Sequence, residues 1–214
     1  MRYELYYWSG IQGRGEFVRL ALEDAGADYV NRDPVEKKSV FAPPFLRAGA
    51  LLIGQTPNIL HYLGPRLRLA PKAEPRRRWL HQQQLTIADW LVEVHDTHHP
   101  LASSLYYEDQ KREAKRRAAI FRKERLPKFM GYFERSLRPK EPVTYVDLSL
   151  FQMIEGLRYA FPKATSRLKA KYPKLLDVHS RVAERPRIAA YLASGRRIPF
   201  NQQGIFRHYP ELDG

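Results

Sequence analysis

Short segments of strand-like and helix-like periodicity alternate at the start of the chain. In YELYYW (3–8), Tyr3, Leu5 and Tyr7 fall on one face of a strand, because successive side chains of a strand point to opposite sides. Further on, apolar residues recur every three or four positions, which is typical of a helix. The expected elements are a strand over 3–8, a turn over 9–13, a helix over 14–25 ended by Gly26, a strand over 28–30 and a loop over 31–42.

The next segment, PPFLRAGALLIGQTPNILHYL (43–63), predicts a hairpin that runs into a helix. The predicted elements are strands over 45–46 and 51–53, a turn over 47–50, and a helix with Thr56 as N-cap, Pro57 in the first position and Gly64 as its end. Free backbone N–H groups and the positive end of the helix then meet beside polar Gln55, which favours binding of an anion. An ordinary hairpin packed against a helix is the alternative interpretation.

Helical periodicity dominates the rest of the chain. Three prolines in PRLRLAPKAEP (65–75) are typical of a linker. Helices are predicted over 76–99 (ended by Pro100), 108–137 (interrupted at Pro127), 144–158, 174–183 and 186–193, and 198–214 is predicted to be irregular. We therefore expect an α/β domain with a small mixed four-stranded sheet over 1–64, a linker over 65–75, and an all-helical domain over 76–214 with an irregular C-terminal tail.

The composition excludes several classes of chemistry. Hydrophobic residues make up 43% of the 214 positions, and there is no cysteine. A cysteine nucleophile, a redox pair and a thiolate zinc site are thereby excluded, and the absence of cysteine fits a reducing compartment. No apolar segment approaches the ~18 residues that span a bilayer. We expect a soluble cytoplasmic protein with no membrane partner.

The chain is strongly basic. Lys and Arg number 37 against 23 Asp and Glu, a formal net charge of +14. The densest basic segment is KREAKRRAAIFRKER (111–125), which also has the apolar positions of an amphipathic helix. A solvated helix face explains it better than a nucleic-acid site, since no nucleic-acid-binding motif accompanies it.

Four motifs occur in a consistent order. They are Tyr7-Trp8 followed by Gly13-Arg14-Gly15-Glu16, then Pro44-Phe45-Leu46, then Gly54-Gln55-Thr56 with the helix after it, and finally Thr144-Tyr145-Val146-Asp147. Together they resemble the cytosolic glutathione transferases, closest to the tyrosine-dependent classes (sigma, pi, mu and alpha). Each motif alone is short and recurs by chance. The resemblance implies a thioredoxin-like first domain that binds glutathione, a helical bundle that lines the electrophile pocket, and a homodimer.

The resemblance also implies how the thiol is activated. A thiol with a pKa near 8.5 is only a few per cent ionised at neutral pH, so the family requires a hydrogen-bond donor aimed at the sulfur. Tyr7, at the end of the first strand, is the expected donor. Tyr6 and Ser9 are the alternatives, because a one-residue shift exchanges the tyrosines and some classes use a serine in the following turn.

The remaining glutathione contacts follow from the same resemblance. Gln55 and Thr56 are expected to hold the γ-glutamyl end, with Trp8 and the Pro43-Pro44 segment nearby. Arg14 either adds charge to the same carboxylate or is a surface arginine. Asp96 lies roughly where the family places an acidic residue that reaches the γ-glutamyl amine across a dimer interface.

Two features depart from the family pattern. Pro43 stands where the family usually donates a backbone N–H to the cysteinyl part of glutathione, and proline has no N–H. Weaker glutathione binding or a shifted pose is the expected result. The loops 31–43 and 138–143 are also short for this family.

Three histidines occur in HDTHHP (95–100). The spacing of His95, His98 and His99 would place their rings on one side of a helix, as in some metal sites. No neighbouring carboxylates complete a standard metal motif, so roles in a pocket or an interface are favoured and no metal is expected. Thr144 and Asp147 are interpreted as a helix-capping pair without a chemical role.

Three functions compete on this evidence. The first is a glutathione transferase that uses glutathione as co-substrate and takes a hydrophobic electrophile. The second is a binding protein on the same fold with little turnover, which Pro43 favours. The third is a basic nucleic-acid-associated module, which has only the net charge to support it. Candidates for the electrophile pocket are Tyr106, Tyr107, Phe206 and Tyr209.

Overall fold

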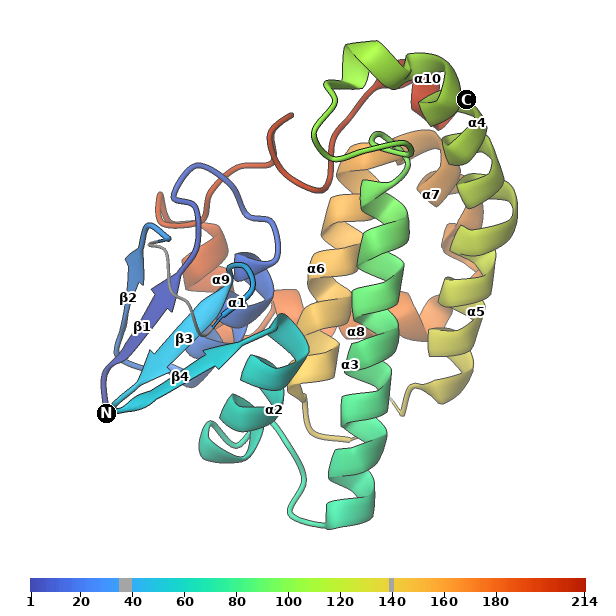
Figure 1. The fold of residues 1–214 in the computed structure, drawn as a ribbon. Coiled ribbons are helices and arrows are strands. Elements are labelled where there is room, and N and C mark those ends of the chain that lie inside the picture. Colours follow the sequence, from blue (N-terminus) through green and yellow to red (C-terminus); the bar gives the residue numbers. More distant parts are fainter. Residues whose placement is uncertain (35–39, 139–140) are drawn as a thin grey trace.

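The computed structural model describes residues 1–34, 40–138 and 141–214. Its N-terminal domain is built on a mixed four-stranded sheet, as predicted, and the strand order is β2-β1-β3-β4 (Figure 1). Strand β1 is parallel to β2 and antiparallel to β3, which forms a hairpin with β4. The elements are β1 (Tyr3–Tyr6), α1 (Gly15–Ala25), β2 (Tyr29–Arg32), β3 (Phe45–Ala48), β4 (Leu51–Gly54) and α2 (Thr56–Arg66).

Helices α1 and α2 cover one face of this sheet. Inward-facing strand residues such as Leu5 and Leu46 pack with Val18 of α1 and Ile59 of α2 in one buried cluster. Alternation along the strands places polar side chains on the other face, where Glu4 and Arg47 pair across β1 and β3. The amphipathic pattern of the first domain therefore determines which face of the sheet the helices occupy.

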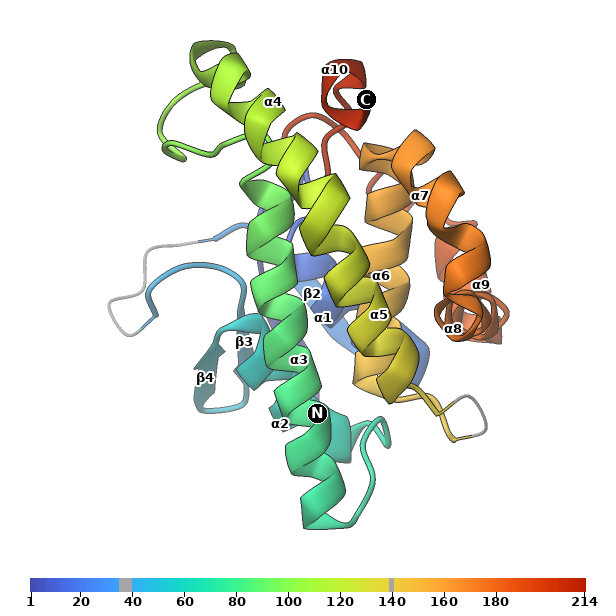
Figure 2. The ribbon, with the colours of Figure 1, turned by 90° about the vertical axis from the view of Figure 1, so that its right-hand side faces the viewer.

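The C-terminal domain is helical, and α6 lies at its centre (Figures 1 and 2). Most of the side chains of α6 are buried, including consecutive ones from Leu148 to Ile154. The helices are α3 (Glu74–His95), α4 (Lys111–Ile120), α5 (Leu126–Ser136), α6 (Tyr145–Ala160), α7 (Pro162–Leu168), α8 (Pro173–Ala183), α9 (Pro186–Leu192) and α10 (Pro210–Asp213). Short 3₁₀ turns at Tyr107–Gln110 and Lys169–Lys171 and a π-helical turn at Phe121–Arg125 join some of them.

Several predicted boundaries near the junction of the two domains were wrong. Thr56 is not an N-cap but the first residue of α2, and Gln55 precedes it with φ +69°. Gly64 does not end α2, which continues through Pro65 to Arg66. A Cβ at Gly64 would lie 2.7 Å from the Tyr145 ring, so this glycine permits close packing of α2 against α6 rather than terminating the helix. The predicted linker consequently overlaps the end of α2 and the start of α3.

Other boundaries shifted for local reasons. Strand β1 stops at Tyr6, two residues early, because the Pro43-Pro44 segment before β3 has no N–H to extend the ladder. Helix α3 ends at His95, where the Thr97 hydroxyl donates to the Val94 carbonyl and turns the chain. The predicted interruption at Pro127 is confirmed, since the π-helical turn precedes it and α5 begins beside it. Helices α7 and α10 were not predicted, and α10 lies in the segment expected to be irregular.

The capping pair at the start of α6 is confirmed. The Asp147 carboxylate accepts from the Thr144 backbone N–H at 2.7 Å and from its hydroxyl at 2.6 Å. This arrangement forms the capping box at the first turn of the most buried helix. The two short loops of the sequence contain residues 35–39 and 139–140, which lie outside the described residues.

Thr144→Ala is expected to lower the free energy of unfolding by about 1–2 kcal/mol, because it removes an N-cap side chain. Urea denaturation measures the change. Thr86→Ala is the control: the Thr86 hydroxyl donates to the carbonyl of Gln82 within α3 and caps no helix, so a change within about 0.5 kcal/mol is expected. An equal loss in both variants would contradict a capping role for Thr144.

Candidate active site

Tyr7 lies at the end of β1 with its ring held against the start of α1. It is 3% exposed, and its phenolic oxygen accepts a hydrogen bond from the Arg14 backbone N–H at 2.9 Å. Two glycines make this contact possible. A Cβ at Gly13 (φ +43°) would lie 2.1 Å from the phenolic oxygen, and one at Gly15 would lie 2.7 Å from the ring. The Gly-Arg-Gly sequence therefore lets the backbone wrap around the tyrosine.

The Tyr7 hydroxyl still has its own proton to donate. A phenol oxygen can accept one hydrogen bond and donate another, and no acceptor for it is found among the described residues. Burial raises the pKa of Tyr7, opposed by the hydrogen bond from Arg14 and by the charges of Arg14 and Arg19. Tyr7 is thus a neutral hydrogen-bond donor at physiological pH.

The two alternative donors lie elsewhere. Tyr6 points to the opposite face of the sheet, where its hydroxyl donates to Glu4 at 2.7 Å and its ring stacks on Phe45. Ser9 lies in the exposed turn after β1, and its backbone N–H donates to the Asp33 carboxylate at 3.1 Å. Of the three, Tyr7 alone is hydrogen-bonded to the residue that also contacts the start of α2.

That residue is Arg14, which connects Tyr7 to Thr56. Its backbone N–H donates to Tyr7, and its carbonyl oxygen accepts from the Thr56 hydroxyl at 3.4 Å. The phenolic oxygen and the Thr56 hydroxyl are therefore no more than about 10 Å apart, since one residue spans at most about 3.6 Å. An extended tripeptide covers about the same distance.

A cleft of about 180 Å³ opens at the N-terminus of α2, between the two domains. Gln55 and Thr56 lie at its α2 side, and Gln55 is exposed. The lining residues are Arg14, Phe17, Gln55, Thr56, Pro57, Gln84, Ile87, Ala88, Leu91 and Val92. The predicted anion site thus coincides with a cavity that one arginine and the positive end of α2 make electropositive.

Two further predicted contacts lie at the same end of the sheet. The Pro43-Pro44 peptide bond is cis, and Phe45, which follows it, is paired with Tyr6. The two prolines are therefore close in register to Tyr7. Trp8 is 48% exposed, and its ring packs edge-to-face on Tyr7 with centroids 5.0 Å apart.

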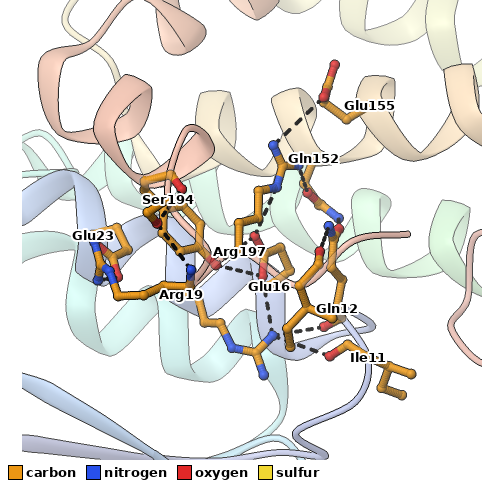
Figure 3. A network of polar contacts seen from close by, with 12 residues as sticks. Ile11, Gln12, Glu16, Arg19, Glu23, Gln152, Glu155, Ser194 and Arg197 are labelled. Atoms are coloured by element: carbon orange, nitrogen blue, oxygen red, sulfur yellow. Dashed lines mark hydrogen bonds and ion pairs between the residues drawn. The ribbon is translucent and has the colours of Figure 1, made fainter. Parts of the chain in front are cut away.

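A buried charge network behind Tyr7 was missed in the sequence (Figure 3). Glu16 and Arg19 are 0% and 2% exposed, and their carboxylate and guanidinium lie 3.3 Å apart. Arg19 also donates to the carbonyl of Gln12 at 3.3 Å and to the side chain of Asn31 at 3.0 Å. Arg19 thereby holds the turn that leads to Gly13 and Arg14. Two opposite charges three positions apart on the apolar side of the predicted helix were the available signal.

The network continues into the C-terminal domain. The Tyr191 hydroxyl donates to the Glu16 carboxylate at 3.0 Å, and the Arg197 guanidinium lies 3.5 Å from it. Arg197 also donates to Gln152 of α6, whose amide in turn donates to Gln12 at 2.7 Å (Figure 3). Burial raises the pKa of Glu16, and the neighbouring arginine charges oppose this. Side chains from α1, α6 and the segment after α9 therefore fix the turn beside Tyr7.

The four candidates for the electrophile pocket do not meet in one place. Tyr106 is 78% exposed, whereas Tyr107 is buried and stacks on Tyr209 with ring centroids 3.8 Å apart. Phe206 is buried against Gly156 of α6. None of the four is among the residues that line the cleft at α2. Their role stays a prediction.

The three histidines lie together at the end of α3, although only His95 is in the helix. Ring centroids are 4.7–5.4 Å apart, and His98 Nε2 is 2.8 Å from the Ile205 carbonyl. Burial lowers the pKa of His98 and of His95. Within residues 1–34, 40–138 and 141–214, no three His, Asp or Glu side chains are arranged to hold a metal ion. Asp96 contacts His95 Nδ1 at 3.2 Å and is not among the residues that line the cleft.

Comparison with known proteins finds similarity to glutathione transferases. Residues 95–195 match the family described as "Glutathione S-transferase, C-terminal domain". A glutathione S-transferase of Plasmodium falciparum (isolate 3D7) is 25% identical over 219 residues, which cover 89% of this chain and 94% of that protein. Residues 95–195 are therefore similar to the C-terminal domain of glutathione S-transferases, and most of the chain is similar to this Plasmodium falciparum protein.

Two further proteins are similar to this chain. A glutathione S-transferase of Plasmodium yoelii yoelii is 23% identical over 206 residues, with 86% of this chain and 90% of that protein covered. The structure of the Onchocerca volvulus Pi-class glutathione S-transferase superposes with a TM-score of 0.74 at 24% identity, over 95% of this chain and 99% of that one. The transferase fold, with a thioredoxin-like sheet followed by a helical domain, is therefore confirmed.

In the part of the chain that the structure describes, no helix combines the length and the apolar character needed to cross a bilayer.

Proposed function

We propose that this protein is a glutathione transferase that adds the thiolate of glutathione to a hydrophobic electrophile, with the Tyr7 hydroxyl stabilising the thiolate. The observation that supports this most directly is the position of Arg14. Its backbone N–H contacts Tyr7 and its carbonyl contacts Thr56. The hydroxyl that would donate to the thiolate and the residue at the anion site are therefore bonded to the same residue.

The cleft at the start of α2 supports a binding pose for glutathione. The γ-glutamyl carboxylate would lie at the start of α2, against the backbone N–H and hydroxyl of Thr56 and the Gln55 side chain. Arg14 adds positive charge there, because it lines the same cleft. The cysteinyl part would then pass Pro43 and Pro44 toward Tyr7. Pro43 can accept but not donate a hydrogen bond, which weakens this contact.

The chemical step requires a thiolate at neutral pH. Tyr7 donates its hydroxyl proton in a hydrogen bond to the sulfur, which lowers the pKa of the thiol, and the thiol proton leaves to solvent. The sulfur electron pair then forms a bond to the electrophilic carbon. In a substitution, the leaving group departs with the electrons of its bond. Each pKa unit of lowering corresponds to about 1.36 kcal/mol of thiolate stabilisation.

Turnover tests the proposal. Purified protein is incubated with glutathione and a panel of electrophiles that includes 1-chloro-2,4-dinitrobenzene, and conjugate formation is followed by absorbance. Saturable conjugation above the uncatalysed rate supports the proposal. Tight glutathione binding without turnover would support the second candidate, a binding protein on the same fold, which the missing N–H of Pro43 favours.

A nucleic-acid role has less support from the structure. Arg117 and Arg125, both in the basic segment, lie within ion-pair distance of Glu93 of α3. Part of the positive charge of this segment is therefore paired with a carboxylate of the helical domain. We propose no nucleic-acid partner, and a cytoplasmic location in keeping with the family.

The family resemblance also leads us to propose a homodimer. Leu85 and Val92 lie seven residues apart on α3 and are 47% and 45% exposed, and Leu51 on the edge strand β4 is 53% exposed. A second copy of the chain would bury these apolar side chains. Because Val92 also lines the cleft, the partner would lie beside the glutathione site.

Gly13→Ala is expected to lower kcat/KM at least about 10-fold while the protein stays folded, because the new Cβ would occupy the position of the Tyr7 hydroxyl. Steady-state kinetics measure it. Gly10→Ala in the same turn is the control, since a Cβ there meets nothing within 4 Å. Normal activity in Gly13→Ala would show that the observed position of Tyr7 is not required.

A further inference from the structure

A second cavity, of about 480 Å³, lies beside the first turns of α3. It is enclosed by the segment between α2 and α3, by the start of α3 and by the connection from α5 to α6, which meet at the lower end of the helical domain in Figures 1 and 2. None of its lining residues lines the cleft at the start of α2. It is therefore a separate site, and its volume is in the range of small-molecule sites, about 300–1,000 Å³.

Positive charge is in excess in this cavity. Four of its lining side chains are cationic and two are carboxylates: Arg68, Lys72, Arg76, Arg138, Glu141 and Asp147. An anionic ligand is favoured by such a balance, because a cavity concentrates the potential of the charges that line it.

The two carboxylates are already engaged. Glu141 is hydrogen-bonded to Arg76 and lies 3.5 Å from Arg138. The Asp147 carboxylate accepts two hydrogen bonds from Thr144 in the capping box of α6. These contacts leave two of the four cations, which belong to the segment between α2 and α3, for a ligand.

The two remaining cations are Arg68 and Lys72. Both side chains are exposed, and neither has a carboxylate within ion-pair distance among the described residues. An arginine binds two oxygens of a phosphate through its planar guanidinium, and a lysine binds phosphate as a point charge. Two unpaired cations four residues apart match a ligand with at least two negative charges better than a single carboxylate.

An accessible aromatic ring lies in the same cavity. Trp79 of α3 lines it and is 39% exposed, whereas Trp90 of the same helix is completely buried. Tryptophan is on average a highly buried residue, so this exposure is unusual. An accessible indole beside cationic side chains can stack on the flat base of a nucleotide whose phosphates contact those cations.

The proposed dimer would not cover this cavity. Leu85 and Val92, the exposed apolar residues of α3, lie roughly 120–140° around the helix from Trp79, since successive residues are about 100° apart. A second copy of the chain on the Leu85 and Val92 side therefore leaves the Trp79 side open.

We propose that this cavity binds a nucleotide of the nucleoside di- or triphosphate class, with the base stacked on Trp79 and the phosphates at Arg68 and Lys72. The charge excess, the two unpaired cations and the accessible ring all belong to one cavity. The proposal does not depend on the proposed transferase activity, because the two sites share no residue.

Isothermal titration of the whole protein tests this with ADP, and with adenosine and pyrophosphate as the two halves of that probe. EDTA is present, so that the protein alone supplies positive charge. The wild type is expected to bind ADP with a Kd below about 100 μM. Adenosine and pyrophosphate should each bind at least about 10-fold more weakly, because each uses only one part of the cavity.

Two variants separate the two parts of the cavity. Trp79→Leu should weaken ADP binding by about 5- to 100-fold, the usual effect of losing a stacked base, and leave pyrophosphate binding unchanged. Lys72→Met should weaken both ADP and pyrophosphate by about 10-fold. Lys128→Met is the matched control, because Lys128 is an exposed lysine of α5 outside the cavity, and it should keep the wild-type Kd.

Arg68→Asn gives an independent test of the phosphate contacts. Arg68 has φ +60°, a backbone conformation that asparagine tolerates, so this variant removes the charge without straining the chain. It should weaken ADP and pyrophosphate binding in the same way as Lys72→Met. Normal binding of both probes in Arg68→Asn and in Lys72→Met would overturn the assignment of the phosphates to this cavity.

Three other results would also overturn the proposal. One is no binding of ADP to the wild type at about 1 mM. Another is an equal loss in Lys128→Met and Lys72→Met, which would show only the general attraction of a basic protein for polyphosphate. The third is displacement of ADP by glutathione, which would place the nucleotide in the cleft at α2. The presence or absence of conjugating activity does not affect these outcomes, so the two proposals are tested separately.

Discussion

Tyr7→Phe is expected to reduce kcat/KM for glutathione and 1-chloro-2,4-dinitrobenzene by about 10- to 100-fold. The phenylalanine ring fills the same space between Gly13 and Gly15 but cannot donate a hydrogen bond to the thiolate. A hydrogen bond to a charged group contributes about 1.5–3 kcal/mol, which corresponds to this range of rates. Steady-state kinetics at pH 6.5 measure the loss.

The pH dependence separates thiolate stabilisation from a packing effect. The rate rises with pH as the bound thiol ionises, and without the donor this rise should move about one to two pH units higher. Variant and wild type should then approach each other at high pH. Tyr6→Phe is the control, because its hydroxyl contacts Glu4 on the other face of the sheet. An unchanged profile in Tyr7→Phe would reject the donor role and favour Ser9.

Arg19→Met is expected to lower the free energy of unfolding by about 3–5 kcal/mol, the usual cost of leaving a buried charge without its partner. Glu16 is completely buried and would keep only the more distant Arg197 guanidinium and the Tyr191 hydroxyl. The turn at Gln12 would lose its support as well. Chemical denaturation measures the change.

Arg78→Met is the comparison for this prediction. Arg78 pairs with Glu74 on the surface of α3, where its side chain is 80% exposed, and an exposed pair of this kind contributes at most about 1 kcal/mol. A loss in Arg19→Met as small as that in Arg78→Met would show that the buried network does not support the fold. In that case Glu16 would have to take up a proton or water to remain buried.

The sequence predicted the features that depend on local patterns. The alternation in residues 3–8 and the hairpin before Gln55 were sufficient to predict the four-stranded sheet. The pair Thr144 and Asp147 was sufficient to predict the helix cap. The residue pair Tyr7 and Thr56 was expected from family resemblance. In the structure both are hydrogen-bonded to the backbone of Arg14, Tyr7 to its N–H and Thr56 to its carbonyl oxygen. Neither periodicity nor spacing could have indicated this.

Features that depend on packing between distant segments were not predictable. Gly64 was interpreted as a helix end because glycine often has that role, but its neighbour is a ring from residue 145, far along the chain. Glu16 was noted only as part of a family motif and Arg19 was not singled out, since only the approach of Tyr191 and Arg197 makes them a buried network.

The contacts of Arg197, Gln152 and Gln12 also restrict how such proteins can be recombined. A chimera that joins the first domain of one relative to the second domain of another would separate Gln12 from Gln152 and Arg197. Unless Gln12 is transferred together with Gln152 and Arg197, the hybrid would have mismatched polar groups at the interface between its domains. Modular exchange at the boundary between sheet and helices is therefore less free in this chain than the two-domain architecture suggests.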